Sequence, residues 1–309
     1  LSGEVGAQIT RARGRLDFTY EDPGAGDSIL DLKAILDAFH LSGIAMTNGR
    51  VRVTGSPAGT LVIPLISADC HAGRLAGTAS IFPGDKDARG YTLDLRLSDV
   101  RFANVLQDLD SVPEEEASIP PDERRGLLSA GVNLRGVVGD AATRRGRGQV
   151  TVLGGRIVSM PVLMGIVRMS NLQLPLDERV DYALVDFFVD GDVVLIEEAS
   201  VQSRNVTIYG FGTAAWPQLD LDMRFRSRSK SRIPLISSVV EGIRDELVTI
   251  HVGGTLRKPE VGLTTLPTTS RLVRRGVGIP PSEQERRLDR IGQRLQPGGV
   301  SGEEPVKPR

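Results

Sequence analysis

The sequence predicts a mainly β fold whose strands carry one apolar and one polar face. Two segments, Tyr91–Ser98 and Leu219–Arg226, show the strict alternation of apolar and polar residues that is typical of half-buried strands. The 35 glycines and 18 prolines are scattered between short apolar runs, which indicates many turns joining many strands. Helical spacing occurs only in a few short segments, too few to cover so much sheet.

The predicted elements run through most of the chain. The strands, in order, are Arg15–Tyr20, Arg50–Thr54, Thr60–Ser67, Arg74–Phe82, Tyr91–Ser98, Leu128–Arg135, Gln149–Leu153, Tyr182–Val189, Asp192–Glu197, Val201–Phe211, Leu219–Arg226, Leu247–Gly253 and Val261–Thr264. Short helices are predicted at Ile29–Phe39, which follows an Asp27-Ser28 capping signal, and at Phe102–Leu109, Met160–Met169, Pro234–Glu246 and Glu283–Leu295.

Two changes in composition divide the chain. A first β module with short helices is expected over residues 1–109, followed by an acidic, proline-containing loop over 110–125. A second β module is expected over 126–265. The remaining residues, 266–309, are rich in Pro and Arg and predict a flexible tail.

Composition excludes several classes of function. The formal net charge of -1 gives no basic footprint, so nucleic acid is not an expected partner. The single cysteine, Cys70, cannot form an internal disulfide. No metal-ligand spacing occurs, and the turn residues Asp190-Gly191-Asp192 account for the densest acidic cluster.

The sequence offers few combinations of residues that could form a catalytic site. Cys70 and His71 are consecutive, and in a strand consecutive side chains point to opposite faces, so they do not form a nucleophile and base pair. Asp220 and Asp222 share a face and leave open a carbohydrate-active enzyme, the least favoured alternative. The sequence therefore assigns no catalytic residue, no metal and no cofactor, and predicts that the protein is not an enzyme.

An ordered series of short motifs from about Cys70 to residue 265 resembles the AsmA-like carboxy-terminal region of AsmA and TamB relatives in the Gram-negative envelope. The motifs, in order, are Ala72–Gly77, Tyr91–Leu97, Val100–Leu109, Leu134–Gly136, Gly146–Val150, Leu153–Ile157, Met160–Leu163, Val189–Val193, Val206–Gly212 and Gly253–Val261. Each motif is weak alone, and their order and spacing carry the resemblance. Residues before 70 match it poorly.

The resemblance implies a long, twisted antiparallel sheet that curls into an apolar groove, with a few short helices. It implies a non-enzymatic envelope protein that binds or conducts phospholipid acyl chains between the inner and outer membranes, in outer-membrane biogenesis. A periplasmic location follows, with membrane contact through an inner-membrane anchor upstream of this chain. Other envelope proteins are further expected partners.

Candidate contacts come from the apolar faces of the alternating strands. The expected acyl-chain contacts are Tyr91, Leu93, Leu95, Leu97, Val132, Leu134, Val206, Ile208, Leu219, Leu221, Met223 and Phe225. A basic run offers possible headgroup or partner contacts at Arg226, Arg228, Lys230 and Arg232, although a solvated loop is the more usual reading of such a run.

The principal alternative is a structural or assembly β-scaffold, a sandwich or a solenoid. In such a scaffold the apolar faces pack on each other and the polar faces bind proteins.

Overall fold

The computed structural model describes residues 9–20, 30–56, 58–84, 88–109, 126–155, 180–204, 206–216, 219–229, 249–255, 258–264, 286 and 290–291. These residues form one sheet of 14 strands and one short helix, α1 (Phe102–Asp108). The strands are β1 Ile9–Tyr20, β2 Leu30–Leu41, β3 Ile44–Gly55, β4 Leu61–Cys70, β5 Gly73–Pro83, β6 Arg89–Arg101, β7 Leu127–Val137, β8 Asp140–Leu153, β9 Val180–Asp190, β10 Val193–Ser203, β11 Val206–Ala215, β12 Asp220–Ser229, β13 Thr249–Gly254 and β14 Pro259–Thr264.

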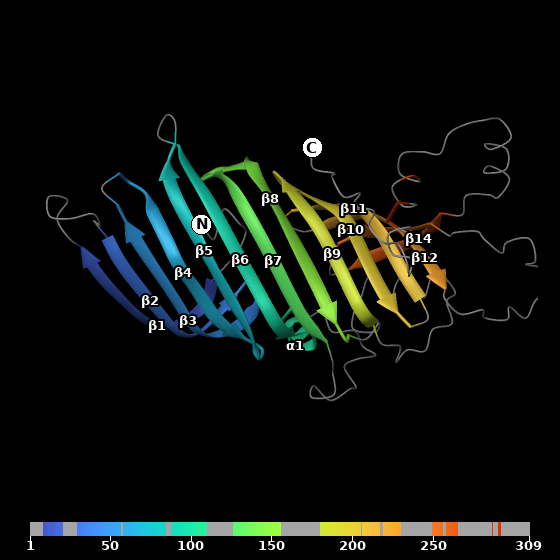
Figure 1. Cartoon of the computed structure of the whole chain (residues 1–309), viewed down its shortest axis with the longest axis horizontal. Helices are drawn as coiled ribbons and strands as arrows, with labels where there is room; N and C mark the ends of the chain where they lie inside the picture. The colour runs from blue at the N-terminus through green and yellow to red at the C-terminus, as the bar shows by residue number, and fades with distance from the viewer. Residues whose placement is uncertain are drawn as a thin grey trace, which may run out of the picture.

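The sheet is an open antiparallel meander in which the spatial order of the strands is their order in the chain. Figure 1 shows the strands side by side along the length of the molecule, with β1 at one end and β12 and β14 at the other. Strands β6 and β7 pair directly, for example at Leu93 and Leu134. The two predicted modules are therefore continuous in one sheet, and the predicted loop 110–125 lies outside the described residues.

The register places apolar residues of successive strands in rows on one face, here called the inner face. One such row joins Leu93, Leu134, Gly146 and Val189 across β6 to β9. The neighbouring residues Asp94 and Asn133 lie on the opposite, outer face. The alternation that predicts half-buried strands is thus confirmed by the pairing.

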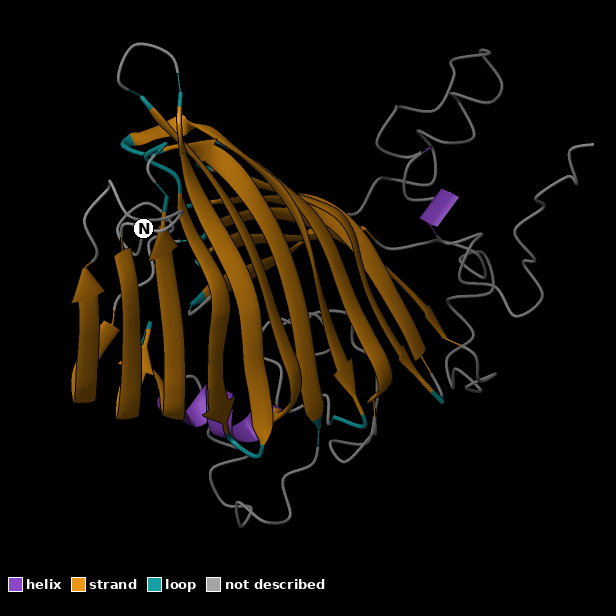
Figure 2. Ribbon diagram, turned by 60° about the vertical axis from the view of Figure 1, so that its left-hand side comes forward, coloured by secondary structure: helices purple, strands orange, loops and turns teal. Residues whose placement is uncertain are grey.

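Glycines on the inner face allow neighbouring strands to approach closely. A Cβ atom added to Gly77 would overlap the carbonyl oxygen of Asp94, and one added to Gly146 would overlap that of Asn133. The same overlap with a carbonyl oxygen of the next strand occurs at Gly14, Gly73, Gly210 and Gly212. Because the crowding falls on the inner face, this is the concave side of the bent sheet seen in Figure 2.

The hydrophobic core lies along the inner face rather than between two layers of strands. One continuous cluster extends from Phe39 in β2 and Met46 in β3 to Ile250 and Val252 in β13. Helix α1 adds Val105 to this cluster. The core is therefore shared by both halves of the chain.

Two hydrogen bonds fix α1 at one end of the strands. The carboxylate Oδ2 of Asp108 accepts a hydrogen bond from the backbone N–H of Ala45 at 2.7 Å. The same oxygen lies 2.6 Å from Nε2 of His71, in the turn between β4 and β5. One side chain thus ties the end of the helix to the start of β3 and to the turn between β4 and β5.

The helix predicted at Phe102–Leu109 is confirmed as α1, but the one predicted at Ile29–Phe39 is wrong, because these residues lie in β2. Strand pairing skips Asp37, since Leu36 pairs with Gly14 and Ala38 with Arg13. This bulge brings Phe39 back to the inner face three residues after Leu36, a spacing that imitates a helix.

Four other predicted segments have different outcomes. Met160–Met169 and Pro234–Glu246 lie outside the described residues, and of Glu283–Leu295 only Arg286, Arg290 and Ile291 are described, in helical conformation. The single strand predicted at Val201–Phe211 is wrong, because a hairpin between β10 and β11 interrupts it. In that hairpin the Ser203 hydroxyl accepts a hydrogen bond from the backbone N–H of Val206 at 3.1 Å.

The role of the inner-face glycines can be tested in β8. We expect Gly146→Ala to lower the free energy of unfolding by about 1–3 kcal/mol, since the new methyl group must displace backbone or side chains that are already packed. Gly131→Ala in β7 is the control, because its Cβ would meet no atom closer than 4.0 Å. Urea unfolding measures both variants, and equal effects would contradict the role assigned to Gly146.

Candidate functional site

The inner face contains an apolar cavity of about 360 Å³ over β5 to β10, here called the inner cavity. Its lining includes five of the predicted acyl-chain contacts, Leu93, Leu95, Leu97, Val132 and Leu134. The remaining lining residues are Leu75, Ala130, Gly131, Arg144, Val150, Phe187, Val189, Gly191, Val194 and Trp216. Cavities of roughly 300–1,000 Å³ are typical of small-molecule sites.

Strand register explains how the five predicted residues meet. Leu95 pairs with Val132 and Leu93 with Leu134, so the side chains of β6 and β7 stand in adjacent rows. On β8 the corresponding positions are Gly148 and Gly146. Side chains from the neighbouring strands lie over both glycines, Leu134 over Gly146 and Phe187 over Gly148.

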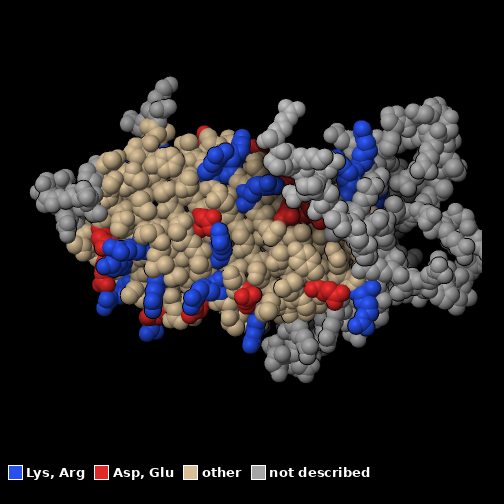
Figure 3. All heavy atoms as spheres, viewed as in Figure 1, with Lys and Arg blue, Asp and Glu red and all other residues tan. Residues whose placement is uncertain are grey.

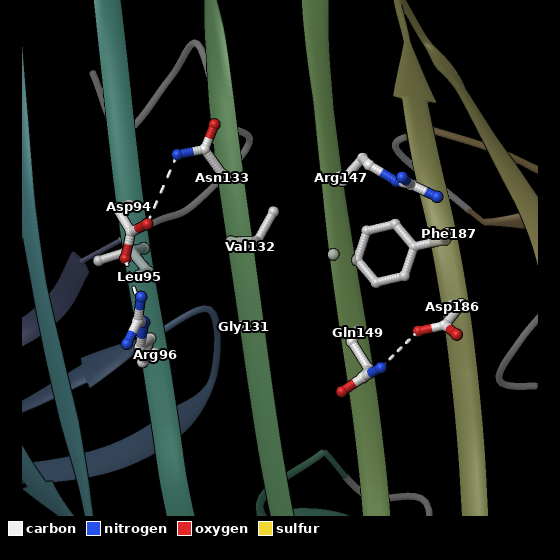
Figure 4. A pocket seen from close by; sticks show the side chains of 11 residues that line it. Asp94, Leu95, Arg96, Gly131, Val132, Asn133, Arg147, Gln149, Asp186 and Phe187 are labelled. Carbon is white, nitrogen blue, oxygen red and sulfur yellow. Dashed lines mark hydrogen bonds and ion pairs between the residues drawn. The ribbon is translucent and has the colours of Figure 1, made fainter. Parts of the chain in front are cut away.

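Phe187 of β9 reaches across to β8. A Cβ atom on Gly148 would overlap the ring of Phe187, so the ring lies directly over the glycine. Figure 4 shows the ring reaching from β9 toward β8. An aromatic surface therefore forms part of the cavity wall at its middle.

Among the residues that the structure describes, Arg144 is the one whose charged side chain reaches the inner cavity. Its side chain is only 9% exposed, and its Nη1 lies 3.5 Å from Oδ1 of Asp192. The Asp192 side chain is 63% exposed. The cavity thus joins an apolar wall to a buried guanidinium near the β9–β10 turn.

Other predicted acyl-chain contacts lie on the inner face but belong to the packed core. Val206, Ile208, Leu221, Met223 and Phe225 are almost fully buried within the main core cluster. Leu219 is half-buried against the same cluster, and Tyr91 is buried in a smaller cluster with Leu93 and Leu134. None of these seven lines the inner cavity.

The predicted basic contacts do not line the inner cavity. Arg226 is buried, and it pairs with Tyr209 on the outer face, where Tyr209 and Phe211 pack with Ile291. The side chain of Arg228 and all of Lys230 and Arg232 lie outside the described residues.

A second, polar cavity of about 470 Å³ is shown in Figure 4. Its polar groups are bonded to each other or to neighbours. Asn133 Nδ2 donates to Asp94 Oδ2 at 3.5 Å, and Gln149 Nε2 donates to Asp186 Oδ1 at 2.7 Å. Arg147 is paired with Glu197 at 2.6 Å. Figure 3 likewise shows acidic and basic side chains interspersed over the face in view.

Three of the side chains considered for catalysis are buried or bonded to other residues. Asp222 Oδ1 lies 2.9 Å from Nε2 of His251, while Cys70 is buried and His71 is bonded to Asp108. Burial, assisted by the charge of Asp108, raises the pKa of the Cys70 thiol from 9.0 to about 11. The thiol is therefore protonated at neutral pH.

The described residues contain neither a metal-binding cluster nor a membrane-spanning helix. Among them, no group of three or more His, Cys, Asp or Glu side chains is arranged to hold a metal ion. No helix formed by these residues has the length and apolar character needed to cross a membrane.

Sequence reasoning missed the residues that give the inner cavity its wall and its charge. Arg144 is followed by Arg145, and Phe187 by Phe188, so each pair hides which member faces inward. The missing signal was register, because the pairing of Gly146 with Leu134 places Arg144 two residues further along the same face.

The environment of Cys70 predicts that its thiol reacts slowly with thiol reagents. A pKa raised from 9.0 to about 11 reduces the thiolate at pH 8 about 100-fold, and burial blocks the reagent as well. Stability from this group is present below pH 9 and is lost as the pH rises toward 11. We expect a thiol reagent to modify native Cys70 at least 100-fold more slowly than the exposed thiol introduced by Ser98→Cys in a Cys70→Ala background.

Equal modification rates for the two thiols in the native state would contradict this. Urea-unfolded protein supplies the second control, because the rates should converge there.

Comparisons with protein families, with curated proteins and with solved structures find no match to this chain.

Proposed function

We propose that the protein is a non-enzymatic envelope protein that binds phospholipid acyl chains along its concave inner face and conducts them between the inner and outer membranes. The observation that carries the proposal is the inner cavity, where the described lining residues other than Arg144 are apolar or glycine. Most of that lining consists of aliphatic side chains without hydrogen-bonding groups. It therefore suits acyl chains without selecting for particular hydrogen-bonding groups.

The energetics favour an apolar ligand. Burying a methylene group contributes about 0.8 kcal/mol, so ten methylenes contribute roughly 8 kcal/mol before the costs of ordering the ligand. Aliphatic walls such as Leu93, Leu95 and Val132 impose no directional bonds on the chain. A ligand held in this way can slide along the wall, as passage between membranes requires.

The meander supports passage along the inner face. Every strand contributes to that face, and the apolar rows continue beyond the cavity toward β4, where Ile63 and Ile66 pack against the residues of β5 and β6. Acyl chains bound in the inner cavity would thus meet further apolar surface on the β4 side. Periplasmic location and an upstream inner-membrane anchor belong to the same proposal.

The edge strand β1 favours a second function, an assembly scaffold. On its inner face Leu16 and Phe18 are 63% and 61% exposed, and β1 pairs with β2 alone among the described strands. Exposed strand edges can template pairing with another chain. A scaffold of this kind would act through protein contacts at β1 and would not need an open inner cavity.

Trp216, the only tryptophan of the chain, lines the inner cavity and reports on its occupancy. We expect phospholipid with brominated acyl chains to quench its fluorescence. We expect Ala130→Leu, which fills the cavity without adding polarity, and Leu95→Gln to weaken this binding about tenfold. Ser98→Gln, on the exposed outer side of β6, is the matched control and should bind as the parent does.

Transfer between vesicles tests the second half of the proposal. The parent chain should speed the movement of fluorescent phospholipid from donor to acceptor vesicles, and Ala130→Leu should slow it. Absence of quenching and of transfer in the folded parent chain would reject the proposal.

The scaffold makes its own prediction. We expect Phe18→Lys at the β1 edge to abolish any self-association or partner binding measured by light scattering, because a charge there opposes edge pairing. If the scaffold is the function, this variant is defective and Ala130→Leu is not. Circular dichroism and urea unfolding check that each variant is folded.

A further inference from the structure

We propose that Arg144 makes the inner cavity selective for amphiphiles with an anionic head, either a carboxylate or a phosphate ester. The apolar chain of such a ligand lies along the cavity and its head meets the guanidinium. This inference rests on the proposed function and names the class of ligand that the same site prefers. Of the described residues that line the inner cavity, Arg144 alone is charged.

The inner cavity has an apolar end and a charged end. The row of Leu97, Ala130 and Val150 lies at one end, and Arg144 lies beyond the row of Leu93 and Leu134 at the other. Arg144 and Val150 are six positions apart on β8, so at ~3.3 Å per residue the lining extends about 20 Å. A single leaflet of acyl chains spans about 15 Å of the bilayer core, so one chain fits lengthwise.

The chemistry of the charged end suits an anion. A guanidinium stays protonated at all physiological pH values, and its planar donors match the two oxygens of a carboxylate or phosphate. Burial removes much of the competing water, which strengthens the attraction. A neutral head placed at the same point would gain less and would still displace water from Arg144.

Asp192 shows how an anion approaches this group. Its Oδ1 lies 3.5 Å from Nη1 of Arg144, while most of the Asp192 side chain is in solvent. A guanidinium carries five N–H donors, so a ligand anion can share it with Asp192 or replace Asp192. The carboxylate of Asp192 therefore acts as a competitor at the rim, and its removal should favour an external anion.

Backbone hydrogen bonds hold the charged end in place. The N–H of Gly191 donates to the carbonyl oxygen of Arg144 at 2.8 Å, which ties the β9–β10 turn to β8. The N–H of Trp216 donates to the carbonyl oxygen of Asp192 at 2.7 Å, which ties the same turn to the end of β11. The guanidinium thus lies beside a turn that is braced on both sides.

The test compares amphiphiles that share one chain and differ in the head. Quenching or displacement at Trp216 gives dissociation constants for oleate, oleoyl lysophosphatidate and oleyl alcohol below their aggregation concentrations, with the full chain. We expect both anions to bind the parent at least tenfold more tightly than the alcohol. The ratio of oleate to lysophosphatidate affinity distinguishes a carboxylate site from a phosphate site.

Two variants locate the preference. Arg144→Gln should reduce the preference for the anions to less than twofold and leave oleyl alcohol binding unchanged, whereas Arg144→Lys should retain part of it. Asp192→Asn, at an exposed position, should tighten anion binding threefold or more without affecting the alcohol. It keeps the test informative if Arg144→Gln does not fold.

The outcomes separate this inference from the proposed function. Equal affinities of the parent for alcohol and anions, or an Asp192→Asn variant without any gain for the anions, would overturn the anionic site and leave acyl binding intact. If neither the alcohol nor the anions bind the folded parent, acyl binding itself is rejected.

Discussion

The close approach of neighbouring strands at the inner-face glycines is the constraint on which the rest of the structure depends. At positions such as Gly77 and Gly146 a side chain would collide with the backbone of the next strand, so glycine at these positions allows the sheet to bend toward this face. The bend shields apolar rows that a flat sheet would expose to water on one side. The core residues are therefore buried because the sheet curves over them, and α1, the single described helix, covers a further part.

The same glycines position part of the wall of the inner cavity. Two of them fall in β8, opposite Leu134 and Val132, where the Leu134 side chain lies over Gly146 and the Phe187 ring lies over Gly148, and both side chains line the cavity. Toward β12 and β13 the inner face is instead fully occupied by residues such as Met223 and Ile250. One apolar face thus serves two purposes along its length, a packed core at one part and an open wall at another.

Much of the fold was predictable from the sequence, because alternation is a local property. Tyr91–Ser98 and Leu219–Arg226 lie in strands with the expected apolar face, and the helix after β6 was also predicted correctly. The error at Ile29–Phe39 arose from a bulge at Asp37, which depends on the partner strand and leaves no local trace. The site was less predictable, since alternation does not tell a packed position from an open one, and only long-range register decides which way Arg144 faces.

Strand order has a consequence for how such a molecule can change in size. Each strand pairs only with its neighbours in the chain. A hairpin that is gained or lost therefore changes the strand pairs at that point of the sheet and leaves every other pairing intact. Adjacent strands lie about 4.8 Å apart, so each hairpin adds about 10 Å to the width of the sheet. The width of the inner face is therefore set by the number of hairpins, and a longer or shorter sheet of this kind can be made by repeating or removing one hairpin at a time.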